Sequence, residues 1–245
     1  MQADARMAMP RPWDGYGDAL CDLKAMEAAA SVDGDLLGHE DRVARTTRDL
    51  AQRAGLGPDE VERMTVAARY HDIGKTRVDP EVLRKPGMFT PAEREAMERH
   101  AEYGAEILAA IPGIDPMMVE AARYHHERYD GRGYEGLGGE EIPLVARIVS
   151  IADVHDALVQ KRCYKPAKPE AEVLAMMAGG DPFPGIGRDA FDPALLRAFV
   201  EMRLDDPAFD EREDRRLADS GGADLRPALR EFARSPVPAQ GPGYK

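Results

Sequence analysis

Hydrophobic residues recur at three- and four-residue spacing along most of this chain, which is the pattern of amphipathic helices. No stretch alternates apolar and polar residues for long enough to indicate a half-buried strand. The pattern therefore predicts an all-α fold, a helical bundle of about seven to nine helices around one interior. The expected helices cover residues 16–30, 38–54, 58–71, 90–111, 115–125, 143–160, 169–178 and 192–203.

Several expected helices begin with a capping residue followed by proline. Thr90-Pro91-Ala92-Glu93 is a capping box with proline at the first helical position. Asp115-Pro116 and Asp192-Pro193 repeat the pattern of a capping carboxylate before proline. We expect one continuous helix after Thr90, with His100 on its inner face.

Two segments interrupt the helical pattern. Residues 127–142 are rich in glycine and are predicted to form a loop, whose length suggests a functional role. Residues 205–245 are charged and rich in Gly and Pro, so we expect a weakly ordered tail with one short helix near 223–233. The expected organisation is an N-terminal arm and helix (1–30), one domain (31–204) and this tail (205–245).

The composition fits one globular domain with appendages. The chain has 245 residues, of which 43% are hydrophobic, and Ala, Leu, Val and Met supply most of the apolar content. A formal charge of −12 argues against binding to nucleic acid polymers or to anionic membranes. A local metal cluster can still reverse the field inside one pocket, so a phosphate-bearing ligand is not excluded.

Cysteine usage and the N-terminus indicate a cytoplasmic protein. Two cysteines, Cys21 and Cys163, are too few for a disulfide framework, and no CxxC spacing suggests zinc. The N-terminus lacks the apolar run of a signal peptide. No stretch approaches the ~20 apolar residues of a membrane span.

Histidine is rare in the chain, and its placement is the strongest chemical signal. Five of the six histidines share predicted helical faces with apolar residues and are expected to point inward. Any one of them could be a hydrogen-bonded core histidine, but so many buried imidazoles would compete for few partners, whereas metal ions satisfy them together. The predicted ligands are His39, His71, Asp72, His100, His125, His126 and Asp153. The sixth histidine, His155, is predicted to pack in the core.

The predicted ligands combine imidazole nitrogen with carboxylate oxygen and include no thiolate, which suits Fe, Mn, Zn, Co or Ni. Adjacent His71 and Asp72 suit a bridge in which Asp72 reaches two ions about 3.5–4 Å apart, an arrangement that hydrolyses phosphoesters. Lys75, one turn beyond Asp72, could place an ammonium against a phosphate oxygen. The alternative is a surface lysine just past a helix end at Gly74.

Two motifs carry a family resemblance. The segment His71-Asp72-Ile73-Gly74-Lys75 resembles the HDIGK signature of the HD phosphohydrolase superfamily. The run from His125 to Tyr134 is similar to the second signature, HHExxDGxGYP, of its HD-GYP subfamily. The likeness continues through Ile151-Ala152-Asp153 to Phe191-Asp192-Pro193 and covers residues 31–200 or so.

The resemblance implies a helical bundle with an interior site for two or three divalent transition-metal ions, Fe or Mn first. It implies hydrolysis of cyclic di-GMP to linear pGpG and, in some members, to GMP. By resemblance the seven predicted ligands bind metal, and Asp72 and Lys75 are the catalytic residues. Asp35 stands where three-metal members have Glu, so it is a candidate ligand of a third ion or, alternatively, a helix-start cap.

Candidate substrate contacts also follow from the resemblance. Lys75, Arg162 and Lys165 match cations that contact phosphate, although Arg162 and Lys165 could equally belong to a solvated basic patch. Tyr134 matches the tyrosine of the GYP motif, which could stack on or border a guanine, or could be an exposed loop residue. The partners implied are cyclic di-GMP or a related cyclic dinucleotide, and diguanylate cyclase (GGDEF) proteins.

The chain departs from the subfamily pattern at one position. Members read GYPEGL where this chain reads Gly133-Tyr134-Glu135-Gly136-Leu137, so the simplest alignment deletes the proline and leaves the loop one residue shorter. No metal ligand is lost, and the departure bears on substrate gating, on the choice of cyclic dinucleotide and on partner docking.

Three functions are compatible with these residues. The first is a metal-dependent cyclic di-GMP phosphodiesterase. The second is a phosphodiesterase of the same architecture for another cyclic dinucleotide or a cyclic mononucleotide. The third is a nucleotide-sensing or interaction module with little turnover.

Overall fold

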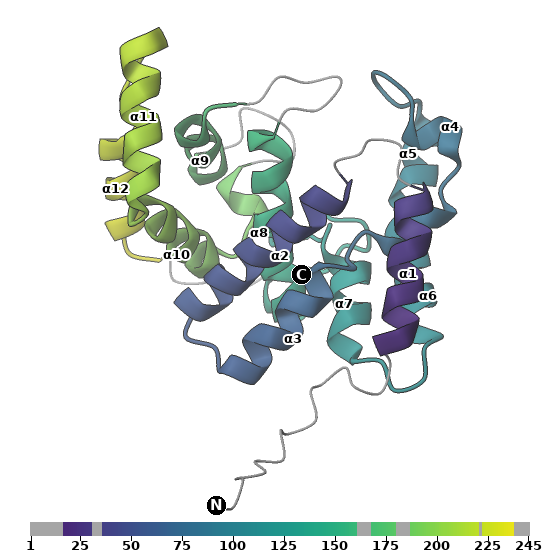
Figure 1. Cartoon of the computed structure of the whole chain (residues 1–245). Coiled ribbons are helices and arrows are strands. Elements are labelled where there is room, and N and C mark those ends of the chain that lie inside the picture. The colour runs from purple at the N-terminus through teal and green to yellow at the C-terminus, as the bar shows by residue number, and fades with distance from the viewer. Residues whose placement is uncertain (1–16, 31–35, 161–167, 180–186, 221, 238–245) are drawn as a thin grey trace, which may run out of the picture.

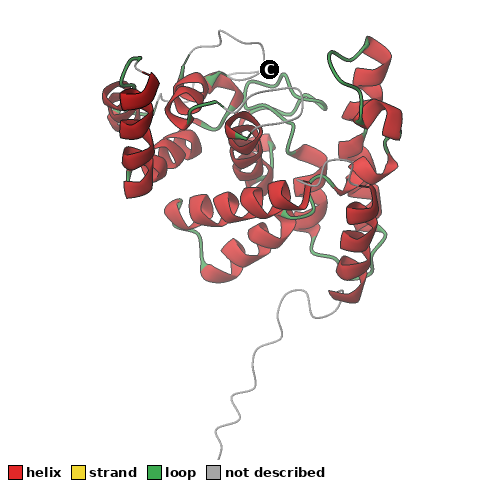
Figure 2. Ribbon diagram, turned by 45° about the horizontal axis from the view of Figure 1, so that its top comes forward, coloured by secondary structure: helices red, strands yellow, loops and turns green. Residues whose placement is uncertain are grey.

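The computed structural model describes residues 17–30, 36–160, 168–179, 187–220 and 222–237. These residues form helices and no strand, which confirms the all-α prediction (Figure 2). The longer helices are α1 (Gly17–Ala30), α2 (Leu36–Arg53), α3 (Pro58–Ala68), α5 (Pro91–Glu98), α6 (His100–Ala109), α7 (Pro116–Tyr124), α8 (Leu144–Val159), α9 (Glu170–Ala178), α10 (Pro193–Leu204), α11 (Pro207–Ser220) and α12 (Arg226–Arg234). The short turns are η1 (Ile73–Arg77), α4 (Pro80–Leu83), η2 (Gly139–Glu141) and η3 (Arg188–Ala190).

The centre of the bundle is built from α2, α3, α7 and α8. Helices α2 and α3 run side by side across the middle of the molecule, and α8 packs along α2 (Figure 1). Helix α7 contacts α3, α6 and α8, whereas α9 to α12 gather at one side. The interior is filled by aliphatic and aromatic side chains with no exposure to solvent, among them Val43, Leu50, Ile73, Leu108, Ile148, Leu174 and Phe199.

The predicted helix starts are confirmed in atomic detail. The Thr90 hydroxyl accepts a hydrogen bond from the Glu93 N–H, and the Glu93 carboxylate accepts one from the Thr90 N–H. Asp115 caps α7 by accepting from the Met117 N–H. Asp192 caps α10 by accepting from two N–H groups of its first turn. Each cap satisfies backbone donors that have no partner inside the helix.

Two helix ends differ from prediction, and both differences concern a histidine. The helix that starts after Thr90 is not continuous, because it ends at Glu98 and α6 starts at His100. Helix α3 ends at Ala68, so His71 lies in the turn after the helix rather than on it. Hydrophobic spacing continues across both turns, which is why it does not reveal them.

The expectation of a weakly ordered tail is wrong for residues 207–220 and 226–234, which form α11 and α12. Phe209 of α11 is 1% exposed and Leu229 of α12 is 2% exposed, so both helices bury an apolar side chain against the bundle. The high charge of α11 hides its single buried aromatic residue from a periodicity argument. The predicted short helix near 223–233 is confirmed as α12, while the division into domains stays a prediction.

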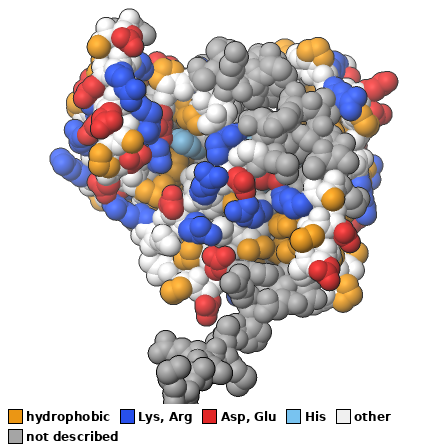
Figure 3. All heavy atoms as spheres, viewed as in Figure 1, with side chains coloured by type: hydrophobic (Ala, Val, Ile, Leu, Met, Phe, Trp, Pro, Cys, Tyr) orange, Lys and Arg blue, Asp and Glu red, His pale blue; other side chains and the backbone are white. Residues whose placement is uncertain are grey.

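Charge on the face drawn in Figure 3 is mixed. Lys and Arg side chains form a band over α2 and α3, with Asp and Glu side chains among them. Arg48 of α2 forms an ion pair with Glu62, and Arg69 at the end of α3 forms one with Asp41. None of the helices in the described ranges is long and apolar enough to cross a bilayer.

Candidate metal centre

The predicted imidazoles and carboxylates converge in the interior, where Asp72 joins two groups of ligand atoms. In each group, one donor atom from every residue lies within 4.8 Å of the others. The first group is His39, His71 and Asp72, and the second is Asp72, His100, His125 and His126. They come from α2, the turn after α3, the start of α6 and the end of α7.

Asp72 presents a different oxygen to each group. Its Oδ2 lies 3.4 Å from Nε2 of His71 and 3.8 Å from Nε2 of His39. Its Oδ1 lies 3.4 Å from Nε2 of His100 and 3.7 Å from Nε2 of His125. A carboxylate whose two oxygens face two sets of nitrogen donors has the geometry of a bridging ligand.

Asp153, on α8, adds a carboxylate to the first group. Its Oδ1 lies 3.2 Å from Nε2 of His39 and 3.9 Å from Nε2 of His71. The first group is thereby given two imidazoles and two carboxylates, and the second three imidazoles and one carboxylate. Both sets suit a borderline divalent cation.

The hydrogen bonds of the rings show that the residues fit a cation. The Nδ1 atoms of His71 and His100 lie 2.7 and 2.6 Å from the Ala68 and Met97 carbonyl oxygens. Nδ1 of His125 lies 3.0 Å from the carbonyl oxygen of Ala121. Because a carbonyl only accepts, each Nδ1 carries the proton, and Nε2 of the neutral ring turns its lone pair toward the centre.

Those lone pairs are crowded together. Nε2 of His100 lies 3.3 Å from Nε2 of His125 and 3.2 Å from Nε2 of His126. Among the described residues, buried Nε2 of His71 makes no hydrogen bond. Nε2 of His100 and Nε2 of His125 both lack a proton and cannot bond each other, whereas a shared cation would satisfy both lone pairs.

Burial keeps most of the rings ready to bind a cation. Burial lowers the pKa of His71 to about 4 and lowers the pKa values of His100 and His126 as well. For Asp72, burial by itself raises the pKa, but the Lys75 ammonium and the neighbouring imidazoles outweigh it and hold the pKa well below its usual range. At neutral pH these three rings are therefore uncharged and the Asp72 carboxylate is charged, which are the forms that bind a metal ion.

His39 has a different environment, which the sequence did not reveal. Its Nδ1 lies 2.7 Å from Oδ2 of Asp156, whose carboxylate also accepts 2.7 and 3.1 Å hydrogen bonds from Arg42. Burial lowers the pKa of His39, but Asp153 and Asp156 outweigh burial and raise it to about 9. A proton and a cation thus compete for Nε2 of His39, while Asp156 fixes the orientation of the ring.

Asp156 and Arg42 were missed although a signal existed. Asp156 lies three residues after Asp153, so both carboxylates share one face of α8. Arg42 lies three residues after His39 on α2. A second carboxylate on a ligand-bearing helix face is a candidate partner for an imidazole.

Lys75 and the loop residue Tyr134 both lie at the edge of the cluster. Nζ of Lys75, in η1, is 2.5 Å from Oδ2 of Asp72, and its side chain is 27% exposed. The ring of Tyr134 lies 4.8 Å from that of His126 between centroids, and the residue is 42% exposed. Burial of the phenol, with the Glu98 carboxylate next, raises the pKa of Tyr134, so the hydroxyl keeps its proton.

Four predicted residues remain to be considered. Asp35, Arg162 and Lys165 fall outside the described residues. His155 is buried, its ring stands 5.0 Å from that of Phe199, and its Nε2 lies 3.3 Å from Glu170, as a packing role predicts.

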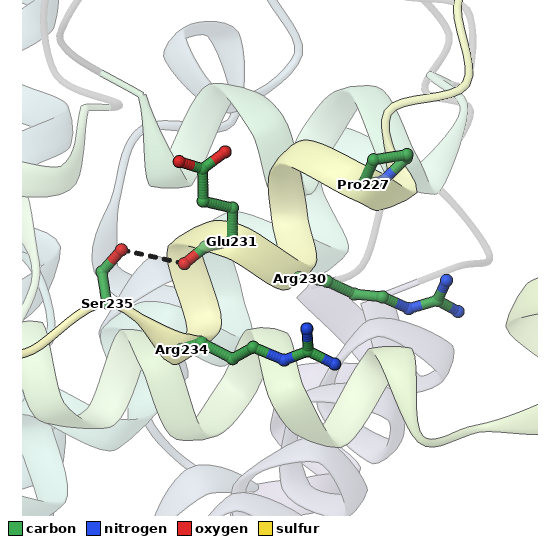
Figure 4. A pocket seen from close by; sticks show the side chains of 5 residues that line it. All are labelled: Pro227, Arg230, Glu231, Arg234 and Ser235. Carbon is green, nitrogen blue, oxygen red and sulfur yellow. Dashed lines mark hydrogen bonds between the residues drawn. The ribbon is translucent and has the colours of Figure 1, made fainter.

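A separate surface pocket lies along α12 (Figure 4). Its lining is Pro227, Arg230, Glu231, Arg234 and Ser235, and the Ser235 hydroxyl donates to the Glu231 carbonyl oxygen. None of these residues belongs to the two ligand groups. This pocket is therefore separate from the buried cluster.

Glycines allow the backbones around the cluster to approach closely. A Cβ on Gly74 would lie 1.9 Å from the His100 carbonyl oxygen and 2.4 Å from the Gly104 nitrogen. The turn that carries Asp72 is thereby pressed against the helix that carries His100. This contact brings ligands from two segments to one bridging carboxylate.

Comparison with known proteins agrees with this arrangement. Residues 25–181 match the family described as HD domain. The chain is 40% identical over 174 residues to the cyclic di-GMP phosphodiesterase response regulator RpfG of Xanthomonas campestris pv. campestris, which covers 70% of this chain and 44% of that protein. It is also 40% identical over 179 residues to 3'3'-cGAMP-specific phosphodiesterase 2 of Vibrio cholerae, which covers 72% of this chain and 33% of that protein. The chain thus spans less than half the length of these two relatives.

A solved structure shares the fold. It is described as Bd1817, a HDG"Y"P protein from Bdellovibrio bacteriovorus, and it matches 78% of this chain and 60% of its own with a TM-score of 0.57 at 18% identity. The family match extends over more than half of the chain and includes every predicted ligand from His39 to Asp153. By sequence and by fold, the chain belongs to the HD domain family.

Proposed function

We propose that this chain is a metal-dependent phosphodiesterase that hydrolyses cyclic di-GMP to pGpG. The observation that carries the proposal is the bridging position of Asp72 between two buried groups of nitrogen and oxygen donors. The relatives support the substrate class, because they are named as phosphodiesterases of cyclic dinucleotides.

In this proposal each group of ligand atoms holds one divalent ion. His39, His71 and Asp153 hold the first, and His100, His125 and His126 hold the second, with Asp72 between them. Fe or Mn is proposed ahead of Zn, Co or Ni on the family resemblance, since a mix of imidazole and carboxylate suits all five metals. Two such ions would ready a water for attack on phosphorus and offset charge on the phosphoryl oxygens.

The chain's own side chains complete the site. Lys75, 27% exposed beside Asp72, supplies a fixed positive charge where a phosphate oxygen would lie. Tyr134 offers one face of its ring at the edge of the cluster, where a purine base can stack. We further propose Arg162 and Lys165 as phosphate contacts and Asp35 as a ligand of a third ion. Docking to diguanylate cyclase proteins is proposed on the resemblance alone.

The test is metal analysis followed by product chromatography. Protein purified without oxygen is expected to hold at least two transition-metal ions per chain and, with Fe(II) or Mn, to release pGpG from cyclic di-GMP. The chromatogram also shows whether GMP follows. Asp72→Asn should retain the fold but lose the second ion or turnover. A fully loaded chain that leaves the dinucleotide intact would contradict the proposal.

A second substrate has specific support. One relative at 40% identity is named for 3'3'-cGAMP, and the identity to the cyclic di-GMP relative is the same. Initial rates on both dinucleotides and on a cyclic mononucleotide separate these candidates. An interaction module would bind nucleotide without turnover and keep its cellular effect after His71→Ala with Asp72→Ala.

A further inference from the structure

The glycine-rich loop beside the metal centre is held by a buried carboxylate. Glu127 is 3% exposed, and both of its oxygens accept backbone hydrogen bonds from the loop. The Glu135 N–H donates to Oε1 at 2.6 Å, and the Leu137 N–H donates to Oε2 at 2.7 Å. A buried carboxylate that accepts two backbone N–H bonds orders the segment that donates them.

Gly133 brings the loop directly onto Glu127. A Cβ at this position would lie 2.5 Å from Cα of Glu127 and 2.8 Å from the nitrogen of Arg128. No other residue type allows so close an approach without displacing the backbone. The loop is therefore fixed on one side of Tyr134 by backbone contact at Gly133 and on the other by the hydrogen bond of Glu135.

Glu135 makes this second anchor because it is not proline. The subfamily motif has proline directly after the tyrosine, and a proline at this position would have no N–H to donate to Glu127. The Glu135 carboxylate also accepts a 2.7 Å hydrogen bond from Nε of Arg123, which lies on α7. With the motif's proline deleted, Glu135 directly follows the tyrosine and ties the loop both to the buried carboxylate and to α7.

Tyr134 lies between these anchors. Its ring is tilted by 39° to the His126 ring at 4.8 Å and stands 6.4 Å from the His100 ring. The residue is also 42% exposed, so part of the ring faces solvent at the edge of the cluster. An aromatic face held beside a phosphodiester site suits the flat surface of a purine base.

We propose that Glu127 and Glu135 are positioning residues that hold Tyr134 as a wall for one purine base of a cyclic dinucleotide, and that this clamp sets the preference between cyclic di-GMP and 3'3'-cGAMP. The inference rests on the proposed function for its substrate. The clamp itself is defined by hydrogen bonds that can be measured without turnover.

The first measurement is amide hydrogen exchange of the metal-loaded chain. Glu135→Pro removes one donor to Glu127, and Glu135→Gln is the matched control that keeps the N–H and loses only the charge paired with Arg123. In Glu135→Pro the Leu137 amide is expected to exchange at least about tenfold faster than in the unmodified chain, whereas Glu135→Gln should stay within about threefold. Unchanged exchange in Glu135→Pro would overturn the clamp.

The second measurement is a double-mutant cycle on KM for the two dinucleotides. Glu135→Pro and Tyr134→Ala are each expected to raise KM about tenfold for the preferred dinucleotide, with kcat changed less than about threefold and with unaltered metal content. The double variant should be no worse than Tyr134→Ala, because Glu135 acts through the ring. Additive effects, or a selectivity ratio unchanged in both single variants, would overturn the inference.

Glu127→Gln tests the other half of the clamp. Glutamine keeps the shape of the side chain, but its NH₂ group would face one of the two backbone N–H donors of the loop. The exchange rate of the Leu137 amide and the KM of this variant should therefore change as they do in Glu135→Pro. Because Glu127 adjoins His126, metal content is measured in parallel. If metal is lost, Glu135→Pro decides the matter, since it lies outside the ligand groups.

The two proposals fail in distinguishable ways. If the loaded chain hydrolyses neither dinucleotide, the proposed phosphodiesterase is wrong. The double-mutant cycle of Glu135→Pro and Tyr134→Ala is then measured on the dissociation constant for cyclic di-GMP. Each single variant is again expected to weaken binding about tenfold. If Glu135→Pro turns over substrate and its Leu137 amide exchanges as in the unmodified chain, the clamp is wrong and the proposed phosphodiesterase is unaffected.

Discussion

At the scale of single residues, the cluster depends on groups that orient its ligands as much as on the ligands. Nδ1 protons of three imidazoles are held by backbone carbonyls, but that of His39 is held by Asp156, which Arg42 holds in turn. An imidazole oriented by a carboxylate is a better donor and loses less freedom on binding a cation.

Replacing Asp156 should therefore weaken one ion more than the other. Asp156→Asn is expected to lower the affinity for the ion of the first group, to which His39 belongs, about 10–100-fold. The neutral amide no longer orients and polarises the His39 ring. Metal content after dialysis against a graded chelator measures this. Asp189→Asn, at an exposed aspartate of η3, is the matched control and should change nothing. Equal loss from both variants would remove the special role of Asp156.

The charge of Lys75 should matter for turnover and not for metal loading. Lys75→Gln is expected to lower kcat/KM about 10²-fold, since a fixed positive charge beside the reacting phosphate is lost. Lys85→Gln is the control, because Lys85 pairs with Glu93 at the start of α5. Initial rates and metal analysis on both proteins check the prediction. A rate loss explained by lost metal would contradict it.

At the scale of elements, the site depends on the close approach of η1 and α6. Gly74 lies against the His100 carbonyl oxygen and Gly104, so two segments far apart in sequence share their backbone surface. Helix formation alone does not produce this contact. It arises because neither glycine carries a side chain that would separate the backbones.

Gly74→Ala should consequently be among the more damaging single substitutions. We expect a loss of about 3 kcal/mol in the free energy of unfolding, because the new methyl overlaps backbone atoms that cannot move aside. Gly57→Ala is the control, since nothing lies within 4 Å of a Cβ there. Urea denaturation followed by circular dichroism measures both. Similar midpoints for the two variants would refute the packing argument.

At the scale of the whole molecule, the carboxylate of Glu170 links three helices, α9, α10 and α11. Glu170 at the start of α9 accepts a 2.7 Å hydrogen bond from Arg203 of α10 and a 2.9 Å bond from Arg212 of α11. Burial by itself would raise the pKa of Glu170, but His155 and Arg203 outweigh it and lower the pKa to about 2. Helix α11 is thereby joined to the folded bundle.

The stability supplied by Glu170 has a defined pH window. Because the folded pKa of about 2 is below the usual 4.5, the contribution is fully present above pH 4.5 and is lost as the pH falls toward 2. Glu170→Gln should lower the unfolding free energy at pH 7 by about 2 kcal/mol and flatten its pH dependence in that window. Thermal denaturation at several pH values checks this, with Glu81→Gln on α4 as control. A parallel pH curve for Glu170→Gln would contradict the assignment.

Much of the candidate site was predictable from local signals. Capping carboxylates before proline at 115 and 192 predicted two helix starts, and the inward histidines predicted which side chains would gather. These signals are local because a cap or a helical face is defined within a few residues. The breaks at Ala68 and Arg99 escaped because apolar spacing continues through them.

The amino-acid sequence by itself determined the helical class, the side chains that gather at the centre and the family. Only the tertiary structure decided that Asp72 turns one oxygen to each group, that Asp156 orients His39, and that Glu127 holds the loop under Tyr134. The first two of these join residues from separate segments, and the third depends on the path of an irregular loop. Periodicity describes a repeating local conformation, so it carries no information on such contacts.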